Sequence, residues 1–152
     1  MTATHAVSPI TAPPPSARPV SIAEVMSVTP PTIHDDESFS LAHEMMKRLG
    51  VRYLPVLDAR GCLVGLLSHE DLYVAEAVET PLSPIDRVSE AMTAAYAVAP
   101  GDLVTDVARA MKERGCECAV VIDRAQVVGL FTAADSLSLL ADEGAAEEGA
   151  CP

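Results

Sequence analysis

Apolar and polar positions follow a pattern along this chain that occurs twice. In each copy two short apolar runs stand close together and are separated by turn residues: 53–58 and 62–67, then 118–123 and 126–131. Apolar runs of this length, bounded by turn residues, predict β-strands, and two of them in succession predict a hairpin. The sequence therefore predicts two hairpins in equivalent places.

Helical spacing of apolar residues precedes each hairpin. Apolar side chains recur three or four positions apart over 39–46 and again over 104–111, which is typical of a helix with one buried face. Gly50 and Gly115 follow these segments, where the end of a helix favours a residue that adopts the left-handed conformation. We therefore expect one amphipathic helix before each hairpin.

A short helix and a short strand open each copy. Ser21 and Glu24 have the spacing of a capping box, so we expect the first helix to begin there and to end near Met26. The apolar segments 32–34 and 97–99 then predict short strands. The order helix, strand, helix, strand, strand, helix repeats after about 65 residues, which is longer than solenoid repeats and indicates two tandem copies of one unit.

The most similar stretches of the two copies are 65–71 and 129–135. In both, an apolar strand ends, Ser68 or Thr132 opens a helix, and an aspartate stands three residues further on. This spacing forms an ordinary capping box, which stabilises the start of a helix without any ligand. The free N–H groups at a helix start also suit a phosphate, and a carboxylate is a natural acceptor for two neighbouring hydroxyl groups. Both interpretations stay open at this point.

Composition and charge exclude several classes of protein. The chain has 152 residues, no Trp and only 3% aromatic residues, so Val, Leu, Ile, Met and Ala must build its core. A net charge of -12 argues against nucleic-acid binding, and it means that an anionic ligand would need a local cluster of Arg or Lys. No apolar run approaches the roughly 20 residues of a membrane span, and no secretory signal is visible. We therefore expect a cytoplasmic protein that contacts neither membrane nor nucleic acid.

The composition also indicates where the ordered domains begin and end. Segments rich in Pro or in acidic and small residues cannot bury enough surface to offset their ordering entropy. The expected organisation is a disordered Pro-rich segment at 1–19, a first domain at 20–78, a linker at 79–84, a second domain at 85–141 and a disordered acidic tail at 142–152.

The cysteines do not indicate a disulfide framework, since the chain is neither very small nor visibly secreted. Cys116 and Cys118 fall on the same face of a strand. A metal site completed by a histidine is one interpretation, and two small apolar core residues are the favoured one. The chain shows no pairing of nucleophile and base and no pair of catalytic carboxylates. We therefore expect that it is not an enzyme.

Several short motifs recur at matching places in the two copies. They are Val25-Met26, Thr32-Ile33, Pro55-Val56-x-Asp58, Val64-Gly65 and Ser68-x-x-Asp71 in the first, and Ala91-Met92-Thr93, Val98, Val121-x-Asp123, Val128-Gly129 and Thr132-x-x-Asp135 in the second. Together they resemble the CBS domain. CBS domains come in pairs that form a pseudo-symmetric unit, the Bateman module, so the resemblance implies an α/β (α+β) fold of two tandem units packed with pseudo-twofold symmetry.

The resemblance also implies a ligand and the residues that hold it. The usual ligands of the family are AMP, ADP, ATP and sometimes S-adenosylmethionine, and no other cofactor is implied. Asp71 and Asp135 would accept hydrogen bonds from ribose hydroxyls, and Ser68 and Thr132 would contact phosphates. The base pockets would be lined by Thr32, Ile33, Tyr53, Pro55, Val56, Val98 and Val121. Arg52, just before an apolar strand, can supply a planar fork for phosphate oxygens.

The two copies differ at positions that matter for such a ligand. Where the first has Thr32, Arg52 and Pro55, the second has Ala97, Glu117 and Val120. Glu117 places a negative charge where Arg52 stands in the first copy, so one of the two sites is a poorer site for a phosphate. The sequence does not decide which, because both copies can contribute to one cleft.

These observations predict a regulatory module. We expect it to bind an adenine nucleotide or a related adenosyl ligand between the two CBS units and to signal through the geometry of a homodimer. The alternative is a CBS pair with empty pockets that dimerises or docks on a partner protein. The sequence names neither the ligand nor the protein target.

Overall fold

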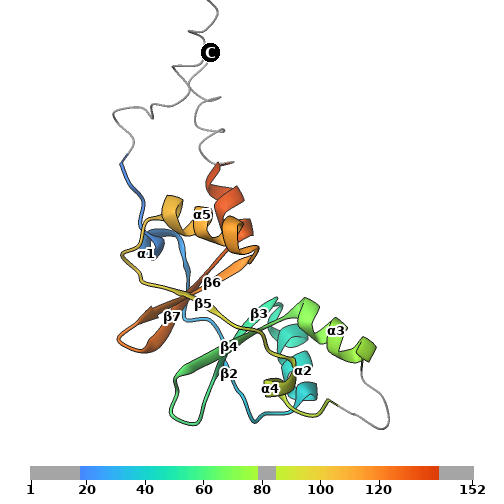
Figure 1. Cartoon of the computed structure of the whole chain (residues 1–152). Coiled ribbons are helices and arrows are strands. Elements are labelled where there is room, and N and C mark those ends of the chain that lie inside the picture. Colours follow the sequence, from blue (N-terminus) through green and yellow to red (C-terminus); the bar gives the residue numbers. More distant parts are fainter. Residues whose placement is uncertain (1–17, 79–84, 141–152) are drawn as a thin grey trace, which may run out of the picture.

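The computed structural model describes residues 18–78 and 85–140 and shows a mixed α/β protein with two sheets (Figure 1). Its elements are α1 (Ile22–Val25), β1 (Ser27–Val28), β2 (Ile33–His34), α2 (Phe39–Leu49), β3 (Tyr53–Leu57), β4 (Leu63–Ser68), α3 (His69–Val78), α4 (Val88–Ala91), β5 (Tyr96–Val98), α5 (Val104–Arg114), β6 (Cys118–Asp123), β7 (Gln126–Thr132) and a last helix at 133–140. The expectations for 1–17, for the linker 79–84 and for the tail 142–152 lie outside the described residues.

The two copies have the same strand pairing. In the first, β2 runs parallel to β3, and β3 forms an antiparallel hairpin with β4. In the second, β5, β6 and β7 are arranged in the same way. Even the irregularity of the hairpin recurs, between Val56 and Leu57 and between Val121 and Ile122. The predicted fold of two tandem units is confirmed.

The element boundaries agree with the predicted ones within about one residue. Ser21 and Glu24 form the expected capping box, in which the backbone N–H of Ser21 donates to Oε2 of Glu24 at 2.8 Å. Gly50 and Gly115 adopt left-handed conformations with φ of 65° and 70°. The strand expected at 97–99 begins one residue earlier, at Tyr96. None of the helices in the described residues is long and apolar enough to cross a membrane.

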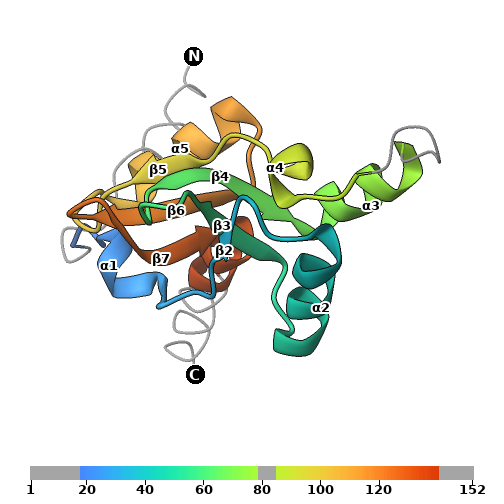
Figure 2. The ribbon, with the colours of Figure 1, turned by 90° about the horizontal axis from the view of Figure 1, so that it is seen from below.

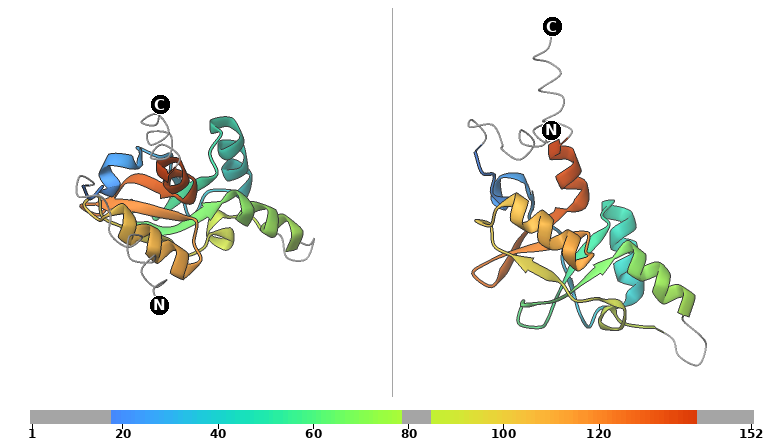
Figure 3. Two further views of the ribbon diagram at one scale, coloured as in Figure 1. Left: turned by 90° about the horizontal axis from the view of Figure 1, so that it is seen from above. Right: turned by 45° about the horizontal axis from the view of Figure 1, so that its top comes forward.

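The two halves exchange their first helices, which the sequence did not predict. β1 follows α1 and pairs with β7 of the second half, and Ile22 of α1 is buried in the same core cluster as Phe131. In return, Thr93 follows α4 and bridges Leu66 of β4, and Val88 of α4 belongs to the core of the first half. Figure 2 shows α1 beside β7, and Figure 3 shows α1 grouped with α5 at one end of the molecule while α4 lies with α2 and α3 at the other.

Three apolar clusters hold the molecule together. One lies in each half, where the sheet packs against its helices, and the third joins the two sheets. The third consists of the buried residues Leu66, Cys118, Val120 and Leu130. Because this cluster holds the two sheets against each other, the helix starts that follow β4 and β7 are brought to a common junction between the halves.

Candidate functional site

Two pockets open at the junction of the two halves and share part of their walls. Arg52, Tyr53, Glu70 and Glu117 line both of them. The pocket that contains Ser68 and Asp71 has a volume of about 290 Å³, and the pocket that contains Thr132 and Asp135 has a volume of about 570 Å³. They are called below the Asp71 pocket and the Asp135 pocket.

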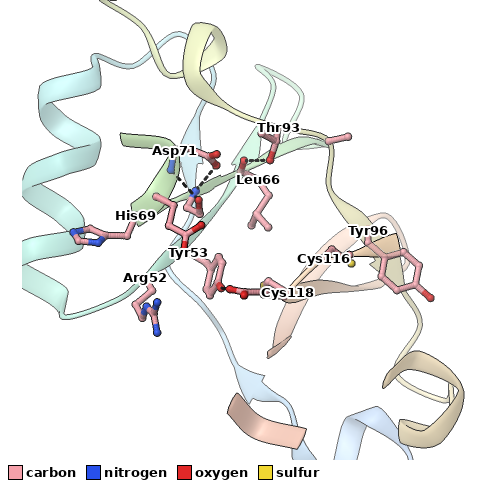
Figure 4. Close-up of a pocket in the computed structure, with 14 residues that line it drawn as sticks. Arg52, Tyr53, Leu66, His69, Asp71, Thr93, Tyr96, Cys116 and Cys118 are labelled. Atoms are coloured by element: carbon pink, nitrogen blue, oxygen red, sulfur yellow. Dashed lines mark hydrogen bonds between the residues drawn. The ribbon is translucent and has the colours of Figure 1, made fainter. Parts of the chain in front are cut away.

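Both aspartates belong to complete capping boxes at these pockets. In the first, the N–H of Ser68 donates to Oδ2 of Asp71 at 2.8 Å, and the N–H of Asp71 donates to Oγ of Ser68 at 3.0 Å (Figure 4). In the second, the N–H of Thr132 donates to Oδ2 of Asp135 at 2.9 Å, and the N–H of Asp135 donates to Oγ1 of Thr132 at 3.2 Å. Within the described residues, Oδ1 of each carboxylate accepts no hydrogen bond. Both aspartates therefore stabilise the start of a helix through a capping box. Each keeps one carboxylate oxygen that a ligand can use.

The Asp135 pocket has an apolar wall that comes from the exchanged segment. β1 supplies Val28, the chain between β1 and β2 supplies Pro30 and Pro31, and β7 supplies Leu130. Val28 is 67% exposed, which is unusual for an apolar side chain of a strand and leaves its surface open to the pocket. A pocket of this size with an apolar wall and a few polar groups is typical of a small-molecule site.

Arg52, Tyr53 and Glu117 lie where the two pockets meet. The hydroxyl of Tyr53 donates to Oε2 of Glu117 at 3.4 Å, which joins the two halves across the junction. Burial, together with the negative charge of Glu117, raises the pKa of Tyr53 to about 12. Arg52 is exposed, and its guanidinium makes no hydrogen bond or ion pair with any other described residue. It is therefore a positive charge available to a ligand.

The Asp71 pocket is smaller and is walled by polar and sulfur-containing side chains. Oγ1 of Thr93 donates to the backbone oxygen of Leu66 at 3.3 Å, and the guanidinium of Arg114 lies over the ring of Tyr96, 4.3 Å from its centroid. Cys116 and Cys118 complete the wall. Burial raises the pKa of the Cys118 thiol to about 12, so this thiol stays protonated and unreactive at neutral pH. No group of three His, Cys, Asp or Glu in the described residues is placed to hold a metal ion.

The structure brings together only part of the predicted site. Arg52 and Tyr53 line both pockets, together with the residues of the capping boxes. Six other residues predicted to line base pockets line neither pocket: Thr32, Ile33, Pro55, Val56, Val98 and Val121. Ile33, Val56, Val98 and Val121 are buried in the cores of the halves, because every second strand residue points toward the helices. Pro55 is fully buried on β3.

The residues that form the pocket walls in their place come from segments that the sequence analysis missed. Thr93, Ala94 and Tyr96 line the Asp71 pocket, and 27–31 lines the Asp135 pocket. Both segments follow the first helix of a copy and cross to the other half. The only feature of the sequence that marks these segments is the methionine that precedes each of them, Met26 or Met92. That feature does not reveal that the two segments cross to the opposite half.

Comparison with known proteins identifies the fold. A family model described as the CBS domain matches residues 22–77 and 88–141. Among solved structures, the CBS domain pair of protein MJ0100, in complex with 5′-methylthioadenosine and S-adenosyl-L-methionine, is similar with a TM-score of 0.72 and 25% sequence identity over 80% of this chain and 99% of that one. The protein CBSX2 in complex with AMP is similar with a TM-score of 0.71 and 21% identity, over 82% of this chain and 98% of that one, which shows the fold alone.

Curated relatives match the chain over only part of their length. A homoserine O-acetyltransferase of Methanosphaerula palustris is 32% identical over 125 residues, which are 81% of this chain and 24% of that protein. The chain thus spans about a quarter of the length of the curated relatives that it matches. The two matched segments of the family model cover most of the chain, and each corresponds to one copy of the repeated strand pairing. The chain belongs to the CBS domain family and contains two CBS domains in tandem.

Proposed function

We propose that the chain is a regulatory module that binds an adenosyl ligand in the Asp135 pocket. The observation that carries the proposal is that Asp135 and Arg52 line the same pocket of about 570 Å³, and that among the described residues neither Oδ1 of Asp135 nor the guanidinium of Arg52 has a hydrogen-bond partner. Ligand pockets typically measure roughly 300–1,000 Å³. The ligands present in the related structures of protein MJ0100 and CBSX2 support this class of ligand.

Each residue of the pocket has a role in this proposal. Asp135 accepts hydrogen bonds from the ribose hydroxyls through its free oxygen, since a carboxylate offers acceptors only. Thr132 opens a helix whose first N–H groups suit an anionic group, and Arg52 supplies a planar fork for phosphate oxygens. Val28 and Leu130 lie on the apolar wall and contact the adenine ring.

The Asp71 pocket is the poorer of the two in this proposal. Its volume of about 290 Å³ is about half that of the Asp135 pocket. Glu117 takes the position in the second copy that Arg52 has in the first, and it directs a negative charge at the same junction. A carboxylate at this position repels phosphate groups. Because Arg52 and Glu117 line both pockets, the larger volume and the apolar wall of the Asp135 pocket are what favour it in this proposal.

We also propose that the protein acts as a homodimer. The last helix of each half carries exposed apolar side chains: Tyr73, Val74 and Val78 on α3, with exposures of 59%, 62% and 61%, and Leu137 and Leu140 on the last helix, with 66% and 62%. Exposed apolar helix faces mark interaction surfaces. A ligand bound between the two halves would change their relative orientation and, with it, the geometry of this dimer.

The activity of the curated acetyltransferases is not part of the proposal, because the chain spans only about a quarter of their length.

Thermal denaturation with a panel of ligands tests the proposal. AMP, ATP, S-adenosylmethionine and 5′-methylthioadenosine are each added at increasing concentration, with guanosine monophosphate as a control for base recognition. A ligand that binds the folded chain stabilises it by RT ln(1 + [L]/Kd), so at least one adenosyl compound should raise the Tm in a concentration-dependent way. Identical Tm values with all of them would overturn the proposal and leave the module with empty pockets that docks on a partner.

A further inference from the structure

Most of the charged side chains at the junction of the two halves are negative. Among the described residues that line the Asp135 pocket, Glu70, Glu117 and Asp135 are acidic, and only Arg52 is basic. The walls of the Asp71 pocket contain the same Glu70, Glu117 and Arg52, together with a third carboxylate and a histidine. A ligand at the junction therefore meets more negative than positive charge in either pocket.

The carboxylate of Glu117 is held at this junction and keeps its charge. The hydroxyl of Tyr53 donates to Oε2 of Glu117 at 3.4 Å, and in Figure 4 the ring of Tyr53 points from β3 toward the strand that carries Cys118. Among the described residues, no basic side chain forms an ion pair with Glu117 or with Glu70. Both negative charges are therefore left uncompensated beside the pockets.

Comparison of the two halves shows that the fold requires neither carboxylate. Aligning the repeated elements pairs Glu117 with Arg52 and Glu70 with Ala134. One half thus has a positive or neutral side chain where the other has a carboxylate, and both halves form the same strand pairing. Glu70 and Glu117 are also exposed and contribute nothing to the buried cores. Folding therefore does not explain why both carboxylates line the pockets.

The charges limit how many phosphate groups the Asp135 pocket can hold. In the proposed function Asp135 binds the ribose and Arg52 binds a phosphate. A single guanidinium neutralises a single phosphate, and the described walls of this pocket contain no second basic side chain. Each further phosphate of ATP would enter a junction lined by Glu70 and Glu117, and like charges at close range repel. An adenosyl compound with one phosphate or none avoids this repulsion.

We propose that Glu117 and Glu70 are specificity-determining residues that select against polyphosphates. The ligand of the Asp135 pocket then carries at most one phosphate group, so AMP or a phosphate-free adenosyl compound binds, and ADP and ATP are rejected. Repulsive groups are a common source of such discrimination, because they weaken the wrong ligand without weakening the right one. This inference rests on the proposed function and narrows its class of ligand.

Calorimetric titration of matched variants tests the inference. 5′-Methylthioadenosine, AMP and ATP are titrated, at one ionic strength and without divalent cations, into the wild type, Glu117→Gln, Glu70→Gln and Glu113→Gln. Glutamine keeps the shape of glutamate and an oxygen that accepts from Tyr53, but it carries no charge. Glu113 is the matched control, because it is exposed on α5 and lines neither pocket, while its substitution changes the net charge by the same amount.

The preference for AMP over ATP is the quantity to compare. AMP should bind the wild type at least about tenfold more tightly than ATP. Tighter binding of ATP should reduce this preference to about threefold or less in Glu117→Gln and should reduce it in Glu70→Gln as well. Glu113→Gln should keep the preference of the wild type, and methylthioadenosine should bind all four proteins alike, because it has no phosphate to repel.

The three ligands separate failure of this inference from failure of the proposed function. Equal binding of AMP and ATP to the wild type overturns the inference alone, and so does an unchanged preference in both pocket variants. Where a nucleotide binds the wild type too weakly to be measured, its binding should become measurable in Glu117→Gln, and continued absence of binding there also overturns the inference. If none of the three compounds binds, the proposed function fails and this inference fails with it.

Discussion

At the scale of single residues, the repeated glycines have a packing role that explains why both copies contain them. A Cβ added at Gly65 would lie 2.6 Å from the sulfur of Met92, and one added at Gly129 would lie 2.5 Å from the sulfur of Met26. Each methionine belongs to the other half of the molecule and precedes the exchanged segment. The glycines are therefore required by a close approach between the halves, not by their backbone conformation.

Gly129→Ala is therefore expected to destabilise the protein. The added methyl group would also lie 3.0 Å from the backbone oxygen of Ser27, which cannot move without disturbing β1. Overpacking of this kind typically costs about 1–3 kcal/mol, and denaturation by urea measures it. Gly101→Ala is the control, since nothing lies within 4 Å of a Cβ at that position. Equal stabilities of the two variants would contradict this account of the exchange.

Tyr53 offers a second test at the same scale. Burial and the charge of Glu117 raise its pKa to about 12, because both disfavour the phenolate. Ultraviolet difference spectroscopy at alkaline pH should therefore show one tyrosine that ionises well above the ordinary pKa of about 10. Since the folded state holds the proton more tightly, the contribution of this group to stability is complete below about pH 10 and is lost as the pH rises through about 12. Glu117→Gln should lower this pKa, and an unchanged titration would show that the contact is not formed in solution.

At the scale of helices and strands, the sequence predicted the features that depend only on neighbouring residues. The hairpins, the amphipathic helices and the left-handed glycines at their ends follow from the periodicity and residue type of each segment. The exchange of α1 and α4 does not, because β1 is only two residues long and its partner β7 is distant in sequence. The residues that line the pockets depend on the same exchange: Val56 and Val121 are buried in the cores, while 27–31 crosses over to form a pocket wall.

The capping boxes make a prediction about these elements that is independent of any ligand. Ser68→Ala removes the acceptor of the N–H of Asp71, and Thr132→Ala removes the acceptor of the N–H of Asp135. Each variant should lose about 0.5–2 kcal/mol of unfolding free energy. Ser40→Ala on α2 is the control, because Ser40 is exposed and its hydroxyl forms no hydrogen bond with another described residue. If both variants were as stable as that control, the boxes would contribute nothing to the helix starts.

At the scale of the whole molecule, two similar halves form a junction that is not symmetric. Arg52 and Tyr53 stand on one side, and Glu117 and Cys118 stand in the equivalent places on the other. This asymmetry was visible in the sequence, but it does not by itself favour one site, because Arg52 and Glu117 line both pockets. The larger pocket is the one that the exchanged segment 27–31 helps to wall, and we propose it as the stronger site.

The proposed homodimer is tested by its apolar helix surface. Val74→Glu and Leu137→Glu each place a charge on a side chain that is more than 60% exposed in the single chain, so the folded chain should tolerate both. Light scattering at micromolar concentration should give about twice the chain mass of 15.9 kDa for the wild type and the mass of one chain for the variants. Val64→Glu on β4 is the control, since Val64 is 40% exposed and belongs to a strand, not to either last helix. A monomeric wild type would contradict the dimer.

The most direct test of the account compares the two aspartates at the junction. Asparagine keeps the shape of each side chain but removes the charge of the carboxylate, so Asp71→Asn and Asp135→Asn separate ligand binding from folding. Each is titrated by calorimetry with the adenosyl compound that raises the wild-type Tm most. We predict that Asp135→Asn weakens binding by about ten- to a hundredfold, as expected for lost hydrogen bonds to a charged group, and that Asp71→Asn changes it by about threefold or less. Binding that is lost in Asp71→Asn and kept in Asp135→Asn would contradict it.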